Sequence, residues 1–233
     1  MRYRARIAVL LLTVWLYGGL WLLNGPPVLA FTTTTFTASG TWTAVSGVTT
    51  VTVKCFGAGQ DGHDGDNVSF GGDGGDGGGY AVKNSFSVTP GNNYTVNVGA
   101  TASEDSWFNS TGTVLANGAS SSTTRVGDTK SAGAFGSSAS GEAGGNGGDS
   151  GGGAPGYGGL GGAGSPTYGA GNAGSAPGGG GGGGSVINVG GAGARGEVQI
   201  IYTTSNSGGF FRIFNAQKVN PYDRPRRIQI SVA

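Results

Sequence analysis

Glycine repeats constrain the fold of this chain more than any other feature. Glycine is the commonest residue between positions 57 and 193, and in residues 71–79 and 144–149 it occupies two of every three positions. A period of three matches neither an α-helix nor a β-strand, but it is the period of the extended polyproline-II-type helix, which has no internal hydrogen bonds. The backbone groups of such a helix need partners in neighbouring segments or in water. Because glycine has no Cβ, segments can approach closely, and the pattern predicts parallel and antiparallel glycine helices bonded side by side.

A flexible linker is the alternative interpretation, since glycine- and serine-rich chains are usually mobile. Strand-like stretches interrupt the glycine at residues 80–88, 94–98 and 123–126, and a linker does not need them. Collagen is excluded, because the chain has only 8 prolines in 233 residues and no continuous single-glycine triplet. We therefore expect at least part of the stretch to be ordered.

The first 30 residues have the pattern of an export signal. Arg2, Arg4 and Arg6 precede a largely apolar run over residues 7–23, and Ala30 ends a short stretch that fits a signal-peptidase site. An uncleaved signal anchor is the alternative, because residues 7–23 lie at the short limit of a membrane-spanning helix. Either interpretation places the rest of the chain outside the cytoplasm. We expect a secreted or cell-surface protein that contacts the membrane only through residues 7–23, if the signal is not cleaved.

The composition narrows the class of partner. The net charge is +1 and charged residues make up 11% of the chain, so nothing suggests a nucleic-acid partner. A single cysteine, Cys55, cannot form an internal disulfide framework, and its place in an alternating stretch predicts a small core residue.

Short alternating stretches predict β-strands around the glycine. Val51, Val53 and Cys55 share one face of such a stretch, and residues 94–98 and 196–202 show the same period of two. Turn residues such as Pro90-Gly91 lie between them. This pattern predicts an all-β fold: an antiparallel β-sandwich over residues 31–203 with a long glycine-rich insertion at about residues 57–193.

Several short sequence motifs, taken in their order along the chain, resemble those of a known family. These are Gly40-Thr41-Trp42-Thr43, Phe56-Gly57-Ala58-Gly59, Tyr94-Thr95-Val96-Asn97-Val98-Gly99 and Gly190-Gly191-Ala192-Gly193. Over residues 36–202 the chain resembles the glycine-rich domains of phage tail-fibre and adhesin proteins and of some bacterial surface proteins. The resemblance implies a β-sandwich with a packed polyglycine-II insertion, and in some members a receptor-binding tip.

No catalytic constellation is visible, and we expect no enzyme and no cofactor. The only histidine, His63, lies in a glycine-rich stretch without a nucleophile elbow. Closely spaced aspartates suggest calcium ligands, and the triplets match the beginning of a calcium-binding nonapeptide. However, Gly78 and Gly151 stand where that motif needs a large apolar residue, so we expect solvated carboxylates and treat as weak calcium candidates Asp61, Asp64, Asp66, Asp73 and Asp76.

Aromatic residues give the candidate contacts within the glycine-rich stretch. Tyr157 and Tyr168 stand in loop-like phrases next to prolines. There they can contact a surface glycan or protein, or simply anchor their loops. We expect Trp107, Phe108 and Phe135 to pack beneath the glycine helices, because a glycine bundle has no side chains of its own to bury.

The C-terminal extension, residues 204–233, predicts two more strands. They can form a hairpin or add to the edge of a sandwich, either their own or that of a neighbouring subunit. The candidate assembly residues are Phe210, Phe211, Ile213, Phe214, Ile228, Ile230 and Val232. The sequence therefore favours an exported structural or assembly subunit that self-associates through its terminal strands. The alternative is an adhesin or tail-fibre-like receptor-binding module that recognises a surface glycan or protein.

Overall fold

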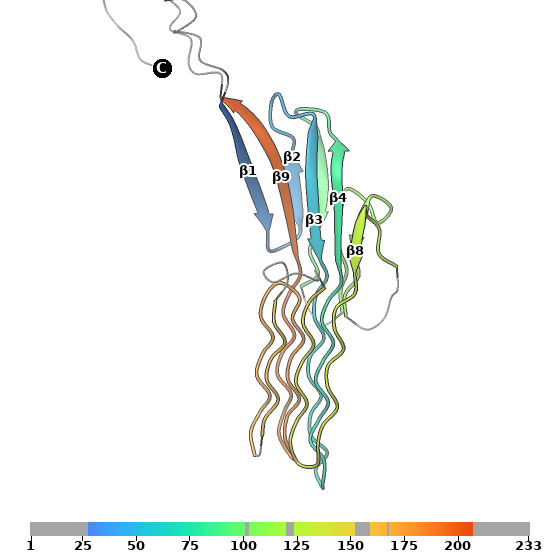
Figure 1. Ribbon diagram of the computed structural model, residues 1–233, viewed down its shortest axis with the longest axis vertical. Coiled ribbons are helices and arrows are strands. Elements are labelled where there is room, and N and C mark those ends of the chain that lie inside the picture. Colours follow the sequence, from blue (N-terminus) through green and yellow to red (C-terminus); the bar gives the residue numbers. More distant parts are fainter. Residues whose placement is uncertain (1–27, 101–102, 120–123, 152–158, 167, 207–233) are drawn as a thin grey trace, which may run out of the picture. The chain divides into compact units, whose positions relative to one another are not determined.

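A computed structural model describes residues 28–100, 103–119, 124–151, 159–166 and 168–206 (Figure 1). Residues Leu29–Thr204 form one compact unit, and the other unit is represented in the described part only by Val28, Ser205 and Asn206. The regular elements of the described part are all strands. Among these same residues, none forms a helix long and apolar enough to cross a bilayer.

The described strands form two antiparallel sheets, so the predicted all-β class is confirmed. The five-stranded sheet has the order β1-β9-β3-β4-β8, and the four-stranded sheet has the order β2-β5-β6-β7. The strands are β1 (Val28–Phe36), β2 (Gly40–Thr43), β3 (Thr50–Phe56), β4 (Tyr80–Ser87), β5 (Asn93–Asn97), β6 (Ser106–Phe108), β7 (Val114–Ala116), β8 (Thr129–Ser131) and β9 (Glu197–Asn206).

The two sheets share one hydrophobic core, which makes the arrangement sandwich-like. In β3 the alternating residues Val51, Val53 and Cys55 are buried, as their period of two predicts. The ring centroids of Trp42 in β2 and Tyr202 in β9 lie 5.8 Å apart. Both side chains belong to the same buried cluster, so the inner faces of the two sheets are in contact.

Two aromatic expectations were wrong. Phe108 is fully buried in the core between the sheets, where its ring lies 5.6 Å from that of Phe86. Phe135 lies in a glycine segment but is 86% exposed. The sheets bury their own aromatic residues, while the glycine segments are held by hydrogen bonds between backbones and need no ring beneath them.

The strand-like stretch at residues 80–88 forms strand β4 over residues 80–87, with a register irregularity opposite Val51 and Val53. Other strands differ from the sequence pattern. The first strand begins at Val28, inside the predicted signal segment. Periodicity did not reveal the three-residue strands β6, β7 and β8, because three residues are too few to establish an alternation.

In the described part of the chain, the glycine-rich residues form eight extended segments in two blocks, separated by β4 to β8, and Figure 1 shows these segments at one end of the sheets. Neighbouring segments are joined by backbone hydrogen bonds at three-residue steps. For example, Gly59, Gly62 and Gly65 donate their N–H groups to the carbonyls of Ala194, Gly191 and Asn188 at 2.8, 2.8 and 2.9 Å. The segments cover residues 57–66, 70–79, 132–140, 143–151, 159–165, 169–175, 178–185 and 189–196.

Segment 178–185 lies at the centre of this arrangement. Its N–H groups donate to segments 169–175, 143–151 and 57–66 in turn, and its carbonyls accept from segments 70–79, 189–196 and 159–165. Every residue from Gly178 to Ser185 is buried. With neighbours on all sides there is no room for a side chain: a Cβ on Gly181 would lie less than 3.0 Å from backbone atoms of Gly191 and Ala192. The central position therefore explains the uninterrupted run of glycines from 178 to 184.

Candidate binding surface

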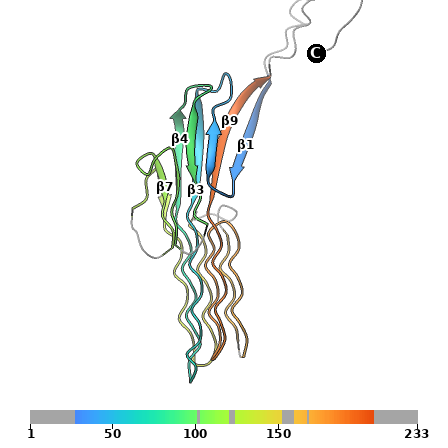
Figure 2. The same ribbon diagram turned by 180° about the vertical axis from the view of Figure 1, so that it is seen from behind.

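Four turns join the glycine segments at the end away from the sheets, as both views show (Figures 1 and 2). We call the described residues of these turns the distal turns: residues 66–70, 140–143, 165–166 with 168–169, and 185–189. Hydrogen bonds connect them to one another or to adjacent segments. Val186 donates its N–H to the carbonyl of Glu142 at 3.1 Å, and Ser185 donates its N–H to the carbonyl of Gly169 at 3.1 Å. The last three turns are therefore joined by hydrogen bonds, and the first lies at the same end of the segments.

The distal turns carry large apolar side chains that face solvent. Their exposed fractions range from 59% to 81%, in the residues Val68, Phe70, Tyr168, Ile187 and Val189. Burying apolar surface on binding is favourable, so exposed apolar side chains that gather at one place indicate an interaction site. Elsewhere in the described glycine segments, large exposed apolar side chains are fewer. Phe135 and Leu160 are examples.

Two of these residues have a positive backbone φ angle. Tyr168 has a φ of 50° and Ile187 a φ of 62°. A positive φ is uncommon outside glycine and is a genuine outlier for a β-branched residue such as isoleucine. Strain of this kind clusters at functional sites, where the surrounding structure holds it. Around Ile187 that support includes Ser185, whose carbonyl accepts the N–H of Asn188 at 2.9 Å.

Asp66 fixes the first distal turn. Its Oδ1 atom accepts the backbone N–H groups of Phe70, Ser69 and Val68 at 2.6, 2.7 and 3.2 Å. Hydrogen bonds from the backbone of Phe70 and Ser69 are the largest causes that lower the pKa of this carboxyl, although its partial desolvation acts in the opposite direction. The charged carboxylate therefore holds the loop that presents Val68 and Phe70.

The other four calcium candidates fasten glycine segments to one another. The Oδ1 atoms of Asp61 and Asp64 accept the N–H groups of Gly193 and Gly190 at 2.7 and 2.8 Å. On a different pair of segments, Asp73 Oδ1 accepts from Ala139 at 2.7 Å.

Asp76 completes this second pair, because its Oδ1 accepts the N–H of Gly136 at 2.9 Å. The two pairs thus reach toward different segments instead of converging on one point. Within the described ranges, no group of three or more histidine, cysteine, aspartate or glutamate residues could hold a metal ion.

Sequence reasoning missed two residues with the same role. Asn146 Oδ1 accepts the N–H of Gly164 at 2.9 Å, and Asp149 Oδ1 accepts the N–H of Gly161 at 2.8 Å. The signal that could have revealed them is their spacing. Acceptor side chains three residues apart recur at the same step as the backbone hydrogen bonds between segments, so both can reach the same neighbouring segment.

The remaining residues for which the sequence predicts a contact lie partly inside and partly outside the described part of the chain. Tyr168 is 73% exposed on a distal turn. Tyr157 lies outside the described residues, and so do all the candidate assembly residues between Phe210 and Val232. Cys55 is fully buried, and burial raises the pKa of its thiol far above the ordinary range. It is the core residue that its strand position predicts, without the thiolate character that reactivity needs.

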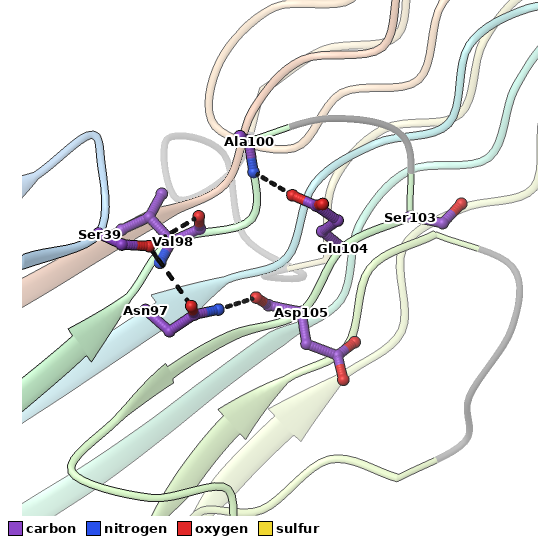
Figure 3. A pocket seen from close by; sticks show the side chains of 7 residues that line it. All are labelled: Ser39, Asn97, Val98, Ala100, Ser103, Glu104 and Asp105. Carbon is purple, nitrogen blue, oxygen red and sulfur yellow. Dashed lines mark hydrogen bonds between the residues drawn. The ribbon is translucent and has the colours of Figure 1, made fainter.

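A polar hollow of about 510 Å³ beside β5 is a second candidate site. Figure 3 shows that much of its polar lining is bonded within the hollow. The Oε2 atom of Glu104 accepts the N–H of Ala100 at 2.8 Å, Asn97 donates to the carbonyl of Asp105 at 2.8 Å, and Ser39 Oγ accepts the N–H of Val98 at 2.9 Å. These groups stabilise the local loop, so the distal turns remain the stronger candidate.

Comparisons with known proteins add no relative, since neither any protein-family model nor any curated protein matches the chain.

Proposed function

We propose that this chain is an exported, non-enzymatic surface protein that uses the distal turns to contact a protein or glycan on another surface. The gathering of Val68, Phe70, Tyr168, Ile187 and Val189 at one end of the glycine segments is the observation that carries this proposal. Apolar and aromatic anchors at the centre of a contact supply most of the binding energy in protein interfaces. This favours the adhesin-type function over the purely structural one.

In this proposal the glycine segments form a polyglycine-II bundle that acts as a rigid support. The three-residue hydrogen-bond steps and the central segment with neighbours on all sides support that interpretation. A rigid support matters because ordering a loop at the moment of binding costs free energy. The described residues of the turns are positioned before contact, since the bundle holds both ends of each turn.

A relationship to the glycine-rich tail-fibre and surface-protein family belongs to the same proposal. It is supported by the phrases around Trp42 and Gly190 and by the combination of sheets with bonded glycine segments. Export rests on the N-terminal sequence alone.

Two exposed phenylalanines provide the test. Phe70 stands on a distal turn, whereas Phe135 is 86% exposed on a segment away from the turns. Labelled protein is applied to a panel of intact bacterial cells and to a glycan array. We expect Phe70→Ala to weaken any binding at least tenfold and Phe135→Ala to leave it unchanged. Equal effects of the two substitutions, or binding that survives when Ile187 is also replaced by Asp, contradict the proposal.

An assembly subunit is the second candidate function. The observation that favours it is that β1 is a long edge strand, which among the described strands pairs on one side only, with β9. The C-terminal residues Phe210–Phe214 and Ile228–Val232 are part of this candidate, as additional strands that pair with a neighbouring subunit.

A further inference from the structure

The two sheets have four edge strands, and three of them are protected against pairing. Strands β7 and β8 have three residues each and β2 has four. Strand β8 also carries Lys130, and Leu115 of β7 is bridged to Val126 by two backbone hydrogen bonds of 2.9 and 3.0 Å. Short length, charge and a covering segment are the usual means by which proteins prevent edge-to-edge association.

Within the described part of the chain, strand β1 has none of these protections. It is nine residues long, from Val28 to Phe36, and contains no charged residue, no proline and no glycine. Among the described strands it pairs on one side only, with β9. Leu29 is 61% exposed and Phe31 is 82% exposed. A long, uncharged edge with apolar side chains is a template for another strand.

We propose that β1 pairs antiparallel with β1 of a second copy about a two-fold axis at Thr33, joining two five-stranded sheets into one. A two-fold contact places the same strand against itself, so the strand must be self-complementary. Strand β1 meets this condition because it has no charges that could repel their own copies. Its four consecutive threonines also form favourable Thr–Thr pairs across strands.

The contact survives removal of the predicted signal segment. Cleavage after Ala30 leaves residues 31–36 of the strand, which are still centred on the threonines and still include Phe31. A single pair of short strands buries less area than a standard interface. The dimer is therefore weak, with an expected Kd of about 1–100 μM.

Introducing a charge at Thr33 tests the proposal. Thr33 is exposed in β1, and Thr203 is an exposed threonine of the interior strand β9. Sedimentation velocity is measured on the purified protein in the form that the cell produces, with the signal segment cleaved or retained. We expect a concentration-dependent dimer whose Kd rises at least tenfold in Thr33→Lys and in Thr33→Glu, because like charges then face each other. An equimolar mixture of the two variants restores the dimer, and Thr203→Lys leaves it intact.

Three results overturn the proposal. The first is a wild-type chain that stays monomeric at every concentration. The second is a dimer that all the Thr33 variants retain. The third is protection of the outer β1 amides from hydrogen exchange that does not depend on concentration, because another segment of the same chain, such as residues 226–232, then occupies the edge.

Discussion

Asp61 and Gly193 are separated by 132 positions in the chain, yet the Oδ1 atom of Asp61 accepts the backbone N–H of Gly193 at 2.7 Å. Three residues further along the chain, Asp64 Oδ1 accepts the backbone N–H of Gly190 in the same way at 2.8 Å. These side-chain bonds alternate with the backbone bonds that Gly59 and Gly62 donate to the same segment. Carboxylates whose spacing in the sequence suggests calcium ligands thus join neighbouring segments by hydrogen bonds.

Removing one of these carboxylates should measurably lower the stability of the folded protein. We expect Asp61→Ala to lower the free energy of unfolding by about 1 kcal/mol, the usual net value of one hydrogen bond. Asp61→Asn should retain most of the stability, because an amide oxygen can accept the same N–H, as Asn146 does for Gly164. Urea unfolding of the three proteins measures this, and equal loss in the Ala and Asn variants would show that charge, not the hydrogen bond, matters.

Calcium should have little effect on stability. The candidate carboxylates Asp61, Asp64, Asp73 and Asp76 each accept a backbone N–H from a neighbouring segment and point toward two different segments. We expect the same Tm in excess calcium and in excess chelator. A Tm that rises with calcium and falls again on chelation would restore the calcium hypothesis.

The central segment should not tolerate a single methyl group. In Gly181→Ala the new Cβ would lie within 3.0 Å of the backbone of Gly191 and Ala192, which cannot move aside as a flexible side chain does. Overpacking typically costs about 1–3 kcal/mol, and more where the surroundings are rigid. Ala163→Val is the matched control, because Ala163 is exposed and its substitution should change stability by less than about 0.5 kcal/mol. Similar melting of both variants would mean that the segment is loosely packed.

Acid should loosen the first distal turn. The backbone N–H groups of Phe70 and Ser69 lower the pKa of Asp66 in the folded protein. The carboxylate therefore stabilises the turn above its unfolded pKa, and this contribution is lost as the pH falls through the folded pKa. We expect an NMR titration to give Asp66 a pKa below about 3.9, the ordinary aspartate value. The amide exchange of Ser69 and Phe70 should accelerate in Asp66→Ala, and unchanged exchange in that variant would refute the role of the carboxylate.

The mature chain should begin at Phe31. The arginines before residues 7–23 and the stretch that ends at Ala30 predict cleavage there, which removes Val28, Leu29 and Ala30 from strand β1. Intact-mass analysis of the exported protein gives the first residue directly. A mass that retains Met1–Ala30 would favour the signal anchor.

The strands and their inward faces could largely be predicted from sequence, because alternation is a local property. Val51, Val53 and Cys55 are buried as their period of two requires, and the regions of β5 and β9 were found in the same way. Strand β1 was hidden because its first residues resemble the end of an export signal. Burial of Phe108 and exposure of Phe135 could not be distinguished, since both are phenylalanines and only packing separates them.

The sequence by itself determined that glycine recurs every third residue and that aspartates recur at the same spacing, so bonding between segments at three-residue steps was foreseeable. Only the tertiary structure decided which segment is surrounded, which segment each carboxylate reaches, and that the turns carrying Val68, Tyr168 and Ile187 gather at one end. The physical reason is that a glycine segment makes no hydrogen bonds with itself. The partners of a segment lie up to 135 positions away, as Ala194 does from Gly59. Because the repeats are alike, the local sequence does not specify which of them pair.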